Sequence, residues 1–404
     1  MKDEKKAPKL RFKGFTDDWE QCKLGQLFNQ EVQYIDPKAE NVPLWSLTVA
    51  DGLVEKTDRY NREFLVKKND KFKLVKDNWF TYNPMNMTLG ALDVNELGQD
   101  IAVSGYYVTM SLDNQFNRTF LKTWMKSDKA IGLFKLYATG SLIEKQRVQF
   151  GTLSEIPSKF PKYEEQTQIG QFFDSLDNLI AANQRKSANL KELKQGYLQK
   201  MFPKNGAKVP ELRFAGFADD WEERKLRDLL NKNSEKNENL SVINVESVSN
   251  KTGFTKQTDQ FEDYSVASAN LSNYYVIREK QFAYNPSRIN VGSIAYKDLG
   301  DEISVVSPLY VSFSTKKVLN DGFLWNWFKT ASFDAQRQRL SEGGVRDILS
   351  FNQLSEMNTM FPTYPEQEKI ASFFKQLDDT IALHQRKLEK LQELKKGYLQ
   401  KMFC

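Results

Sequence analysis

Two long stretches of the chain place apolar side chains at alternating steps of three and four residues, the spacing of one face of an α-helix. The first stretch runs from Tyr163 to Phe202 and the second from Tyr364 to Phe403. The pattern continues for about 33 residues, so it predicts a coiled-coil seam about 50 Å long. The seam positions are Ile169, Phe173, Leu176, Ile180, Asn183, Ser187, Leu190, Lys194, Tyr197 and Met201 in the first stretch, and Ile370, Phe374, Leu377, Ile381, His384, Leu388, Leu391, Lys395, Tyr398 and Met402 in the second.

These two stretches are copies of one another. The first ends in LKQGYLQKMFP and the second, about 200 residues later, in LKKGYLQKMFC. A second matching pair is PKLRFKGFTDDWEQCKLGQLF from Pro8 and PELRFAGFADDWEERKLRDLL from Pro210. A weaker third pair is FTYNPMNMTLGAL from Phe80 and FAYNPSRINVGSI from Phe282. The period is far longer than that of a solenoid repeat, so each half should be a domain followed by a long helix.

The matching segments divide the chain into four predicted parts. Two domains should occupy residues 1–161 and 204–362, and two spacer helices should occupy residues 162–203 and 363–404. Between the matching segments the two halves have little in common. The chain therefore contains two copies of the matching segments, which we call the frame, and between them segments that differ between the halves.

A helix with one apolar stripe must bury it, and the nearest partner for each spacer helix is its own duplicate. The alternative is that each helix packs on its own domain, but the sustained heptad favours pairing. A pseudo-twofold axis between the halves would make the helices antiparallel, with the domains at opposite ends. Gly196 and Gly397 interrupt the helices at equivalent places, which suggests close backbone approach to another surface.

Polar residues occupy the middle of both seams. His384 is the only histidine in the chain, and its counterpart is Asn183. A lone histidine can be a catalytic base or a metal ligand, but no cysteine or carboxylate cluster stands near it at ligand spacing. We expect Asn183 and His384 to form a buried polar contact that fixes the register of the helix pair.

The segments that differ between the halves contain strand patterns. DIAVSGYYVTMSL from Asp100 and EISVVSPLYVSFS from Glu302 alternate small or polar residues with branched and aromatic ones, which indicates a strand in each. Asn83-Pro84 and Asn285-Pro286 indicate turns after short aromatic strands. The predicted fold class is α+β: two α/β domains with twisted sheets, joined by two long helices that form an antiparallel coiled coil.

Composition adds little to this picture. The 404 residues are 27% charged and 40% hydrophobic and carry a net charge of +5, typical of a folded protein whose anionic partners would meet local patches. No apolar run approaches the length needed to cross a bilayer, and the N-terminus lacks the apolar core of a signal peptide, so we expect a cytoplasmic protein without a membrane partner. We expect Cys22 and Cys404 to be free thiols.

Motifs for catalysis are missing from the sequence. The Asn-Pro segments lack the second proline and the following aromatic residue of the adenine methyltransferase motif, and no glycine-rich cofactor loop precedes them. No phosphate-binding loop and no supported serine or cysteine nucleophile is present, and one histidine leaves most hydrolytic schemes without a base. The sequence therefore predicts a protein that is not an enzyme and that binds no metal.

Basic residues in the differing segments are the remaining candidates for function. Two domains with matched frames and unlike basic loops are what a reader of two unlike DNA half-sites needs. Arg288, in YNPSRINVG, is the first choice for a base contact, and its counterpart is Asn86. The candidate DNA-binding residues are Arg59, Arg62, Lys67, Lys68, Arg118, Arg278, Arg288, Lys297 and Arg346.

The paired LRF.GF.DDWE..KL openings and the paired EQ..I..FF..LD..I…QRK…GYLQKMF helices resemble the specificity subunit of Type I restriction-modification systems, over essentially the whole chain. The resemblance implies two target recognition domains, each reading one half of a split, asymmetric double-stranded DNA sequence, with the helices as a ruler. It implies two modification subunits that use S-adenosylmethionine to methylate adenine. It also implies restriction subunits that use ATP and Mg to translocate and cleave DNA.

Two rival interpretations remain. A coiled-coil scaffold that joins two partner proteins would show no sequence-dependent affinity for DNA. A stand-alone nuclease or methyltransferase would show turnover by the purified chain. The recognised bases do not follow from the sequence, because they depend on loop conformation and DNA shape.

Overall fold

The structure is a computed structural model that describes residues 7–56, 71–140, 146–204, 206–256, 270–341 and 348–403. It divides into two compact units, which we describe separately. The first unit contains residues 1–184 and 385–404, and the second contains residues 185–384. Each unit thus takes in one sheet-containing domain and a part of both long helices. This grouping cuts the chain differently from the four-part division by sequence, which stays a prediction.

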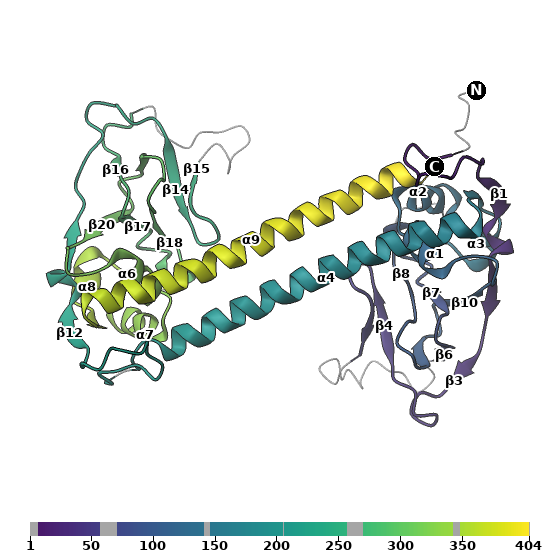
Figure 1. The fold of residues 1–404 in the computed structure, drawn as a ribbon, viewed down its shortest axis with the longest axis horizontal. Helices are drawn as coiled ribbons and strands as arrows, with labels where there is room; N and C mark the ends of the chain where they lie inside the picture. Colours follow the sequence, from purple (N-terminus) through teal and green to yellow (C-terminus); the bar gives the residue numbers. More distant parts are fainter. Residues whose placement is uncertain are drawn as a thin grey trace. The chain divides into compact units, whose positions relative to one another are not determined.

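The first unit is built from short strands and three short helices, followed by the first half of a long helix (Figure 1). Its strands are β1 (Glu20–Lys23), β2 (Phe28–Glu31), β3 (Tyr34–Ile35), β4 (Trp45–Thr48), β5 (Gly52–Glu55), β6 (Phe72–Val75), β7 (Phe80–Tyr82), β8 (Leu92–Val94), β9 (Ile101–Ser104), β10 (Val108–Leu112) and β11 (Pro157–Phe160). Its helices are α1 (Arg118–Met125), α2 (Asp128–Tyr137), α3 (Phe150–Ser154) and the first part of α4 (Tyr163–Lys200).

The second unit repeats this order of elements. Its strands are β12 (Glu222–Lys225), β13 (Leu230–Lys232), β14 (Val245–Ser249), β15 (Gly253–Lys256), β16 (Tyr275–Ile277), β17 (Gln281–Tyr284), β18 (Ile294–Tyr296), β19 (Ser304–Val306), β20 (Val311–Thr315) and β21 (Asn358–Phe361). Its helices are α6 (Asp321–Trp327), α7 (Ala331–Leu340), α8 (Phe351–Ser355) and the first part of α9 (Tyr364–Met402).

The sheets near the long helices are the same in both units. An antiparallel four-stranded sheet has the order β2-β10-β7-β8 in the first unit and β13-β20-β17-β18 in the second, and β1-β11 and β12-β21 form equivalent two-stranded sheets. The outer strands also share an order: the first unit has β3-β6-β9 and the β4-β5 hairpin, which a parallel bridge between Leu44 and Ala102 joins to β9, and the second has β15-β14-β19-β16 with a parallel β14-β19 pair. The frame that repeats in sequence therefore also repeats in structure, and the differing segments form the outer sheets.

Each of the two segments predicted as one strand is divided into two strands by a turn. Strands β9 and β10 are separated by the turn around Gly105, and β19 and β20 by a turn at the equivalent place. A Cβ atom at Gly105 would clash with the carbonyl oxygen of Lys71, so this turn needs glycine. The expected aromatic strands are present as β7 and β17, each followed by its Asn-Pro turn.

The two long helices pair within each unit, as the seam predicted, and they run antiparallel, as expected from a pseudo-twofold axis between the halves. In the first unit the ring of Phe172 on α4 packs edge-on against Tyr398 on α9, at 5.0 Å between centroids. In the second unit Tyr197 on α4 packs in the same way against Phe373 on α9, also at 5.0 Å. The α+β class with a helical pair is therefore confirmed.

The ends of the helices enter the domain cores. Ile169 and Phe173, near the start of α4, belong to the core of the first unit together with Met402 and Phe403 at the end of α9. The amide of Leu10 donates to the carbonyl of Lys401 at 3.0 Å, so the end of α9 lies beside the first described residues of the chain (Figure 1). Packing on a partner helix and packing on a domain thus occur together, along different parts of each helix.

The close approach expected at the two helix glycines is not made by the described residues of this chain. A Cβ atom placed on Gly196 or Gly397 would meet no described atom within 4 Å. Within the described part of this chain, then, no backbone or side chain approaches these glycines closely enough to require them. As to membranes, no helix among the described residues is both long and apolar enough to cross one.

Candidate nucleic-acid interface

A buried ion pair anchors the segment before the first strand of each sheet domain to a long helix. In the first unit Arg11 donates from Nε and Nη2 to the two carboxylate oxygens of Glu165, at 2.8 and 2.7 Å. In the second unit Arg213 donates to Glu366 with the same geometry, at 2.7 and 2.8 Å. Both glutamates are almost fully buried, and a bidentate pair of this kind fixes orientation as well as position. The arginine of the LRF motif is therefore structural.

The glutamine that follows each of these glutamates joins the start of the long helix to the start of α1 in the first unit and of α6 in the second. Gln166 accepts from the amide of Asn117 at 2.9 Å and donates to the carbonyl of Pro161 at 2.8 Å. Gln367 makes the equivalent bonds to Asn320 and Pro362, each at 2.8 Å. Asn117 and Asn320 are the N-caps of α1 and α6, so this Glu-Gln pair fixes how the short helices sit on the frame.

Charged residues in the seams pair across the helices. Lys395 on α9 forms an ion pair with Asp177 on α4 in the first unit, and Lys194 on α4 forms one with Asp378 on α9 in the second. Both lysines are seam positions in the sequence, but the seam does not explain their charge. The two aspartates, which are also equivalent in the two copies, are the feature of the sequence that could have predicted these ion pairs. A parallel arrangement in register would instead place aspartate beside aspartate.

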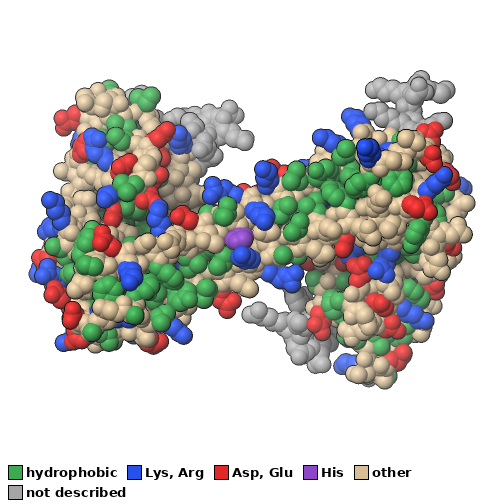
Figure 2. Space-filling model, viewed as in Figure 1, with side chains coloured by type: hydrophobic (Ala, Val, Ile, Leu, Met, Phe, Trp, Pro, Cys, Tyr) green, Lys and Arg blue, Asp and Glu red, His purple; other side chains and the backbone are tan. Residues whose placement is uncertain are grey.

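The predicted register pair is not tested by these contacts. Asn183 is buried and donates from Nδ2 to the carbonyl of Leu179 in its own helix at 2.7 Å. His384 is half-buried and is the purple side chain at the surface in Figure 2. The two residues belong to different compact units, so their contact stays a prediction.

The predicted DNA-binding residues have different surroundings. Arg59, Arg62, Lys67, Lys68 and Arg346 lie outside the described residues. Arg118 begins α1, where its guanidinium pairs with Glu96 at 3.3 Å and donates to Asn78. Arg278 is held by Glu235 through two hydrogen bonds of 3.0 and 2.7 Å, and these bonds raise the pKa of the guanidinium.

Arg288 and Lys297 lie at opposite extremes of exposure. Arg288 precedes the short helical turn Ile289–Val291, and its side chain is exposed, with no ion-pair partner among the described residues. Lys297 is only 2% exposed and forms a 2.7 Å ion pair with Glu246 of β14. Its ammonium also lies 5.0 Å from the centroid of the Phe254 ring. The structure thus gives Lys297 a structural role, because a DNA phosphate reaches it only if this buried pair opens.

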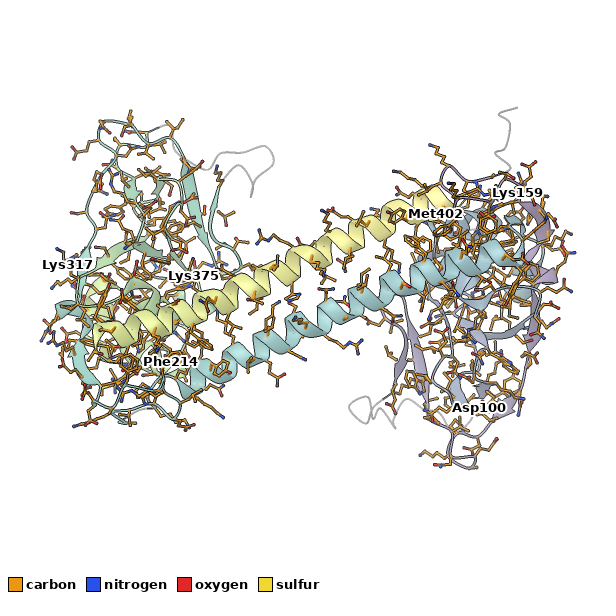
Figure 3. All side chains as sticks on the ribbon, viewed as in Figure 1. Asp100, Lys159, Phe214, Lys317, Lys375 and Met402 are labelled. Atoms are coloured by element: carbon orange, nitrogen blue, oxygen red, sulfur yellow. The ribbon has the colours of Figure 1, made fainter. Side chains whose placement is uncertain are left out.

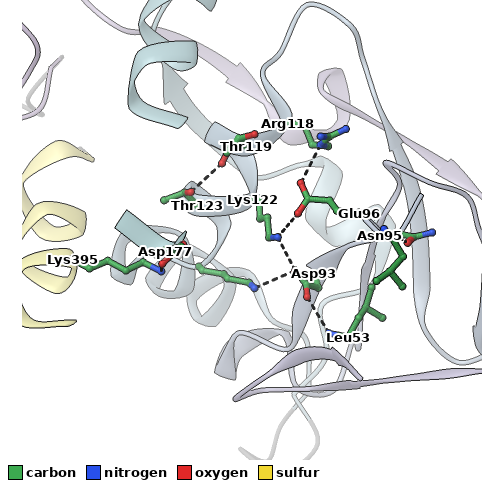
Figure 4. A network of polar contacts seen from close by, with 12 residues as sticks. Leu53, Asp93, Asn95, Glu96, Arg118, Thr119, Lys122, Thr123, Asp177 and Lys395 are labelled. Atoms are coloured by element: carbon green, nitrogen blue, oxygen red, sulfur yellow. Dashed lines mark hydrogen bonds and ion pairs between the residues drawn. The ribbon is translucent and has the colours of Figure 1, made fainter. Parts of the chain in front are cut away.

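In the first unit a polar network ties the β4-β5 hairpin to α1 (Figure 4). The carboxylate of Asp93, in the middle of β8, accepts from the amide of Leu53 at 3.0 Å and pairs with Lys122 and Lys126 at 3.6 and 3.3 Å. Burial acts to raise the pKa of Asp93, but the two lysines outweigh it and leave the pKa below its usual value. Lys122 continues the network to Glu96 at 2.6 Å. An outer hairpin is thereby fixed to the repeated frame.

In the second unit three consecutive residues at the end of β18 join the outer sheet to the repeated frame. Tyr296 donates to Asp321 at the start of α6, Lys297 pairs with Glu246 of β14, and Asp298 pairs with Lys375 of α9. Lys375 is labelled in Figure 3. The outer sheet, the short helix and the long helix therefore meet at one strand end. The contacts differ from those of the first unit, but the elements joined include the outer hairpin in both.

The described residues offer little for catalysis. Among them, no group of three or more histidine, cysteine, aspartate and glutamate side chains is arranged to hold a metal ion. Burial raises the pKa of the free Cys22 thiol to about 11, which makes it a poor nucleophile at neutral pH. On the face shown in Figure 2, lysine and arginine side chains are spread among acidic ones and form no single basic patch.

Comparison with known proteins agrees with this organisation. Residues 218–393 match the family described as Type I restriction modification DNA specificity domain. This part of the chain is therefore similar to Type I specificity domains. The matched residues cover most of the second unit and more than half of α9, and the first unit repeats the same frame. The resemblance of the duplicated motifs to specificity subunits is therefore confirmed.

Relatives of similar length support the same family. The specificity subunit of the Type I restriction enzyme MjaVIII from Methanocaldococcus jannaschii is 22% identical over 94% of this chain and 91% of its own length. A crystal structure of a Type I restriction-modification S subunit from M. genitalium covers 98% of this chain and 99% of its own, with a TM-score of 0.63 and 14% identity. A structure from work on complex assembly of the Type I system covers 95% and 97%, with a TM-score of 0.50 and 13% identity. At these identities the structures show that the fold is shared.

Proposed function

We propose that this chain is the non-catalytic specificity subunit of a Type I restriction-modification system. Its two sheet domains read the two halves of a split, asymmetric double-stranded DNA sequence. The chain then directs partner subunits, which methylate adenine within that sequence and cleave DNA with ATP.

One observation carries the proposal: the frame repeats in sequence and in structure, whereas the residues of the outer strands differ. Both units keep the bidentate arginine–glutamate pair and the glutamine bonds at the start of the long helix. By contrast β4 and β5 have the sequences WSLT and GLVE in the first unit, whereas β14 and β15 have VESVS and GFTK in the second. Two constant supports with unlike outer surfaces suit the reading of two unlike half-sites.

The partners follow from the same duplication. Two copies of a modification subunit would dock on the surfaces that repeat, and restriction subunits would join the complex through them. S-adenosylmethionine, ATP and Mg would be bound by those subunits. The residues of this chain recognise the target DNA sequence and hold the two recognition surfaces in place.

The direct test is to express the chain with its modification subunit in cells that lack adenine methylation and to sequence the methylated adenines. A split motif with two unlike halves is the expected result. Absence of new methylation, with both proteins soluble and associated, would instead favour the scaffold interpretation. Methylation by the chain without a partner would contradict its assignment as a non-catalytic subunit.

A single substitution tests the reading of one half-site. Arg288 is exposed in the loop after β17, and a bidentate contact from arginine to guanine contributes about 1–3 kcal/mol of discrimination. Arg288→Ala should relax the second half-site only. Asn86→Ala, at the equivalent position of the first unit, is the matched control and should leave that second half-site unchanged. An unaltered methylation motif in the Arg288 variant would remove this residue from the recognition surface.

A further inference from the structure

One loop has the same shape in both units, although most of its side chains differ. It follows β7 at residues 83–91 and β17 at residues 285–293, and the structure describes all of these residues. The two sequences are NPMNMTLGA and NPSRINVGS, which share the Asn-Pro pair and one glycine. We call these segments the first loop and the second loop.

The backbone angles of the two loops agree. In the first loop Asn86 has φ −113° and ψ 11°, and Gly90 has φ 89° and ψ 20°. In the second loop the equivalent Arg288 has φ −133° and ψ 11°, and Gly292 has φ 83° and ψ 20°. Both loops therefore contain, at the same place, a glycine in the left-handed region that other residues rarely adopt.

Equivalent hydrogen bonds hold the two loops. In each bond a backbone amide donates to a backbone carbonyl, and the distances agree between the copies. The pairs are Ala91 to Asn86 and Ser293 to Arg288 at 3.1 Å, and Val148 to Pro84 and Leu349 to Pro286 at 3.0 Å. Met87 and Ile289 are buried at the same position of each loop. The shape of the loop is therefore fixed by backbone contacts and one buried side chain, and not by its exposed side chains.

The exposed side chains of the loops differ in chemistry. At three positions that are exposed in both copies, the first loop has Met85, Asn86 and Leu89, and the second has Ser287, Arg288 and Val291. Asn86 presents an amide where Arg288 presents a guanidinium. Leu89 and Val291 are both aliphatic, and they are 62% and 51% exposed. One backbone thus presents different hydrogen-bonding groups beside an aliphatic group that is kept.

This combination distinguishes among the ligands that an exposed loop can meet. The sugar-phosphate backbone of DNA is the same in both half-sites, so a phosphate contact needs no difference between the loops. Two copies of one partner protein would likewise meet two copies of the same side chains. Bases differ between unlike half-sites, and proteins read them by hydrogen bonds and apolar contacts in the major groove. A shared backbone with unlike polar groups therefore favours base contacts.

We propose that the first loop reads bases in the first half-site and the second loop in the second half-site, an inference that rests on the function proposed above. Asn86 contacts an adenine through its two polar atoms, and Arg288 contacts a guanine in the same way. Leu89 and Val291 lie against the methyl group of a thymine, the apolar group that bases present in the major groove. Because the backbones agree, exchanging a residue between the loops moves a base preference from one half-site to the other.

The test uses the full chain in complex with its modification subunit. Asn86→Arg and Arg288→Asn each give one loop the residue of the other. The matched control is Lys135→Gln, which gives an exposed residue of α2 the side chain of its counterpart Gln338 in α7. Methylated adenines are mapped in cells without other adenine methylation. Rates of methylation (kcat/KM) are then compared on duplexes that differ at one base pair of the split motif.

Asn86→Arg should change one base pair of the first half-site from A·T to G·C, and Arg288→Asn should change one base pair of the second from G·C to A·T. Each variant should prefer its new base pair by about 10- to 100-fold, the discrimination that a bidentate contact provides. Neither should alter the other half-site, and Lys135→Gln should alter neither. Asn86→Ala and Arg288→Ala should relax the same base pairs, and they replace an exchange that does not fold.

Replacing a thymine by uracil tests the aliphatic contact, because uracil lacks only the methyl group. At one position of the first half-site this replacement should lower kcat/KM about fourfold for the wild type, the effect of one buried methyl group. With Leu89→Ala the two duplexes should react at equal rates. Equal rates with the wild type at every thymine would overturn the aliphatic contact.

The outcomes separate this inference from the function on which it rests. A wild type that gives no split motif overturns the proposed function and this inference together. A split wild-type motif that both exchanges leave unchanged overturns this inference alone. So does an exchange that lowers the rate equally on every duplex, which indicates a contact with the DNA backbone. An exchange that folds but no longer binds the modification subunit also overturns it, because the loop then contacts that protein.

Discussion

Truncating Phe403, the next-to-last residue of the chain, should destabilise the domain that contains the first residues. Its side chain is 6% exposed, stacks on Phe173 at 5.8 Å between ring centroids and packs edge-on against Phe120 at 5.7 Å. A buried phenylalanine replaced by alanine costs about 3–5 kcal/mol, through lost transfer free energy and the cavity that remains. A domain is typically stable by about 5–15 kcal/mol, so Phe403→Ala removes a large part of this reserve.

The matched control is Phe202→Ala, at the equivalent end of α4. Phe202 is 4% exposed and packs against Phe323, at 5.2 Å, within the core of the second unit. Hydrogen exchange measured by mass spectrometry should locate the loss of protection in the first unit for Phe403→Ala and in the second for Phe202→Ala. Equal loss in both units, or a loss of less than about 1 kcal/mol, would refute the view that each helix end completes one core.

Three further sets of substitutions test the pairing of the long helices, their glycines and a buried lysine. Asp177→Lys places two lysines together and should destabilise the chain by about 1 kcal/mol, and adding Lys395→Asp should restore most of the lost stability. A double-mutant cycle measured by denaturant unfolding tests this, and a cycle without coupling would exclude the ion pair as a register contact. Gly196→Ala and Gly397→Ala should each stabilise the chain by up to about 1 kcal/mol, since no described atom fills the space; destabilisation would show a constraint that the described residues do not contain. Burial and the nearby Lys194 lower the pKa of Lys329 to about 7. Above that pH the unfolded chain therefore binds more protons than the folded chain, and the free energy of unfolding should rise from pH 7 towards 8.5. In chemical unfolding, Lys329→Met should flatten this rise.

The long helices were predictable from sequence because their signal is local and repeated. A seam of apolar residues at steps of three and four specifies a helix whatever surrounds it, and the structure has α4 and α9 at Tyr163–Lys200 and Tyr364–Met402. The strands were less predictable. A single alternating pattern covered both β9 and β10, because the turn between them is set by the contact of Gly105 with a distant carbonyl. Alternation records which residues are buried and does not record where a strand turns back.

The candidate DNA contacts were the least predictable part, because composition does not distinguish a basic residue at the surface from one in a buried pair. Lys297 and Arg288 stand nine residues apart in the same half of the chain, yet one is almost fully buried and the other exposed. The difference lies in Glu246, some fifty residues earlier, which forms the ion pair with Lys297. Only the fold brings such a carboxylate next to its lysine. For the same reason the sequence does not indicate the pairing of Arg11 with Glu165, which lies 154 residues later.

Comparison of the two halves reveals contacts that comparison of single positions misses. In the first unit Tyr34 pairs across strands with Lys73, whose ammonium lies 5.8 Å from the centroid of the tyrosine ring. In the second unit the equivalent pair is Lys236 with Tyr275, at 3.6 Å. Each position on its own counts as a mismatch between the halves, but the cation–π contact is kept with its partners exchanged. The duplication therefore preserves some pairwise contacts even where the residues differ, and a search for paired exchanges between the halves would extend the frame beyond the segments that match in sequence.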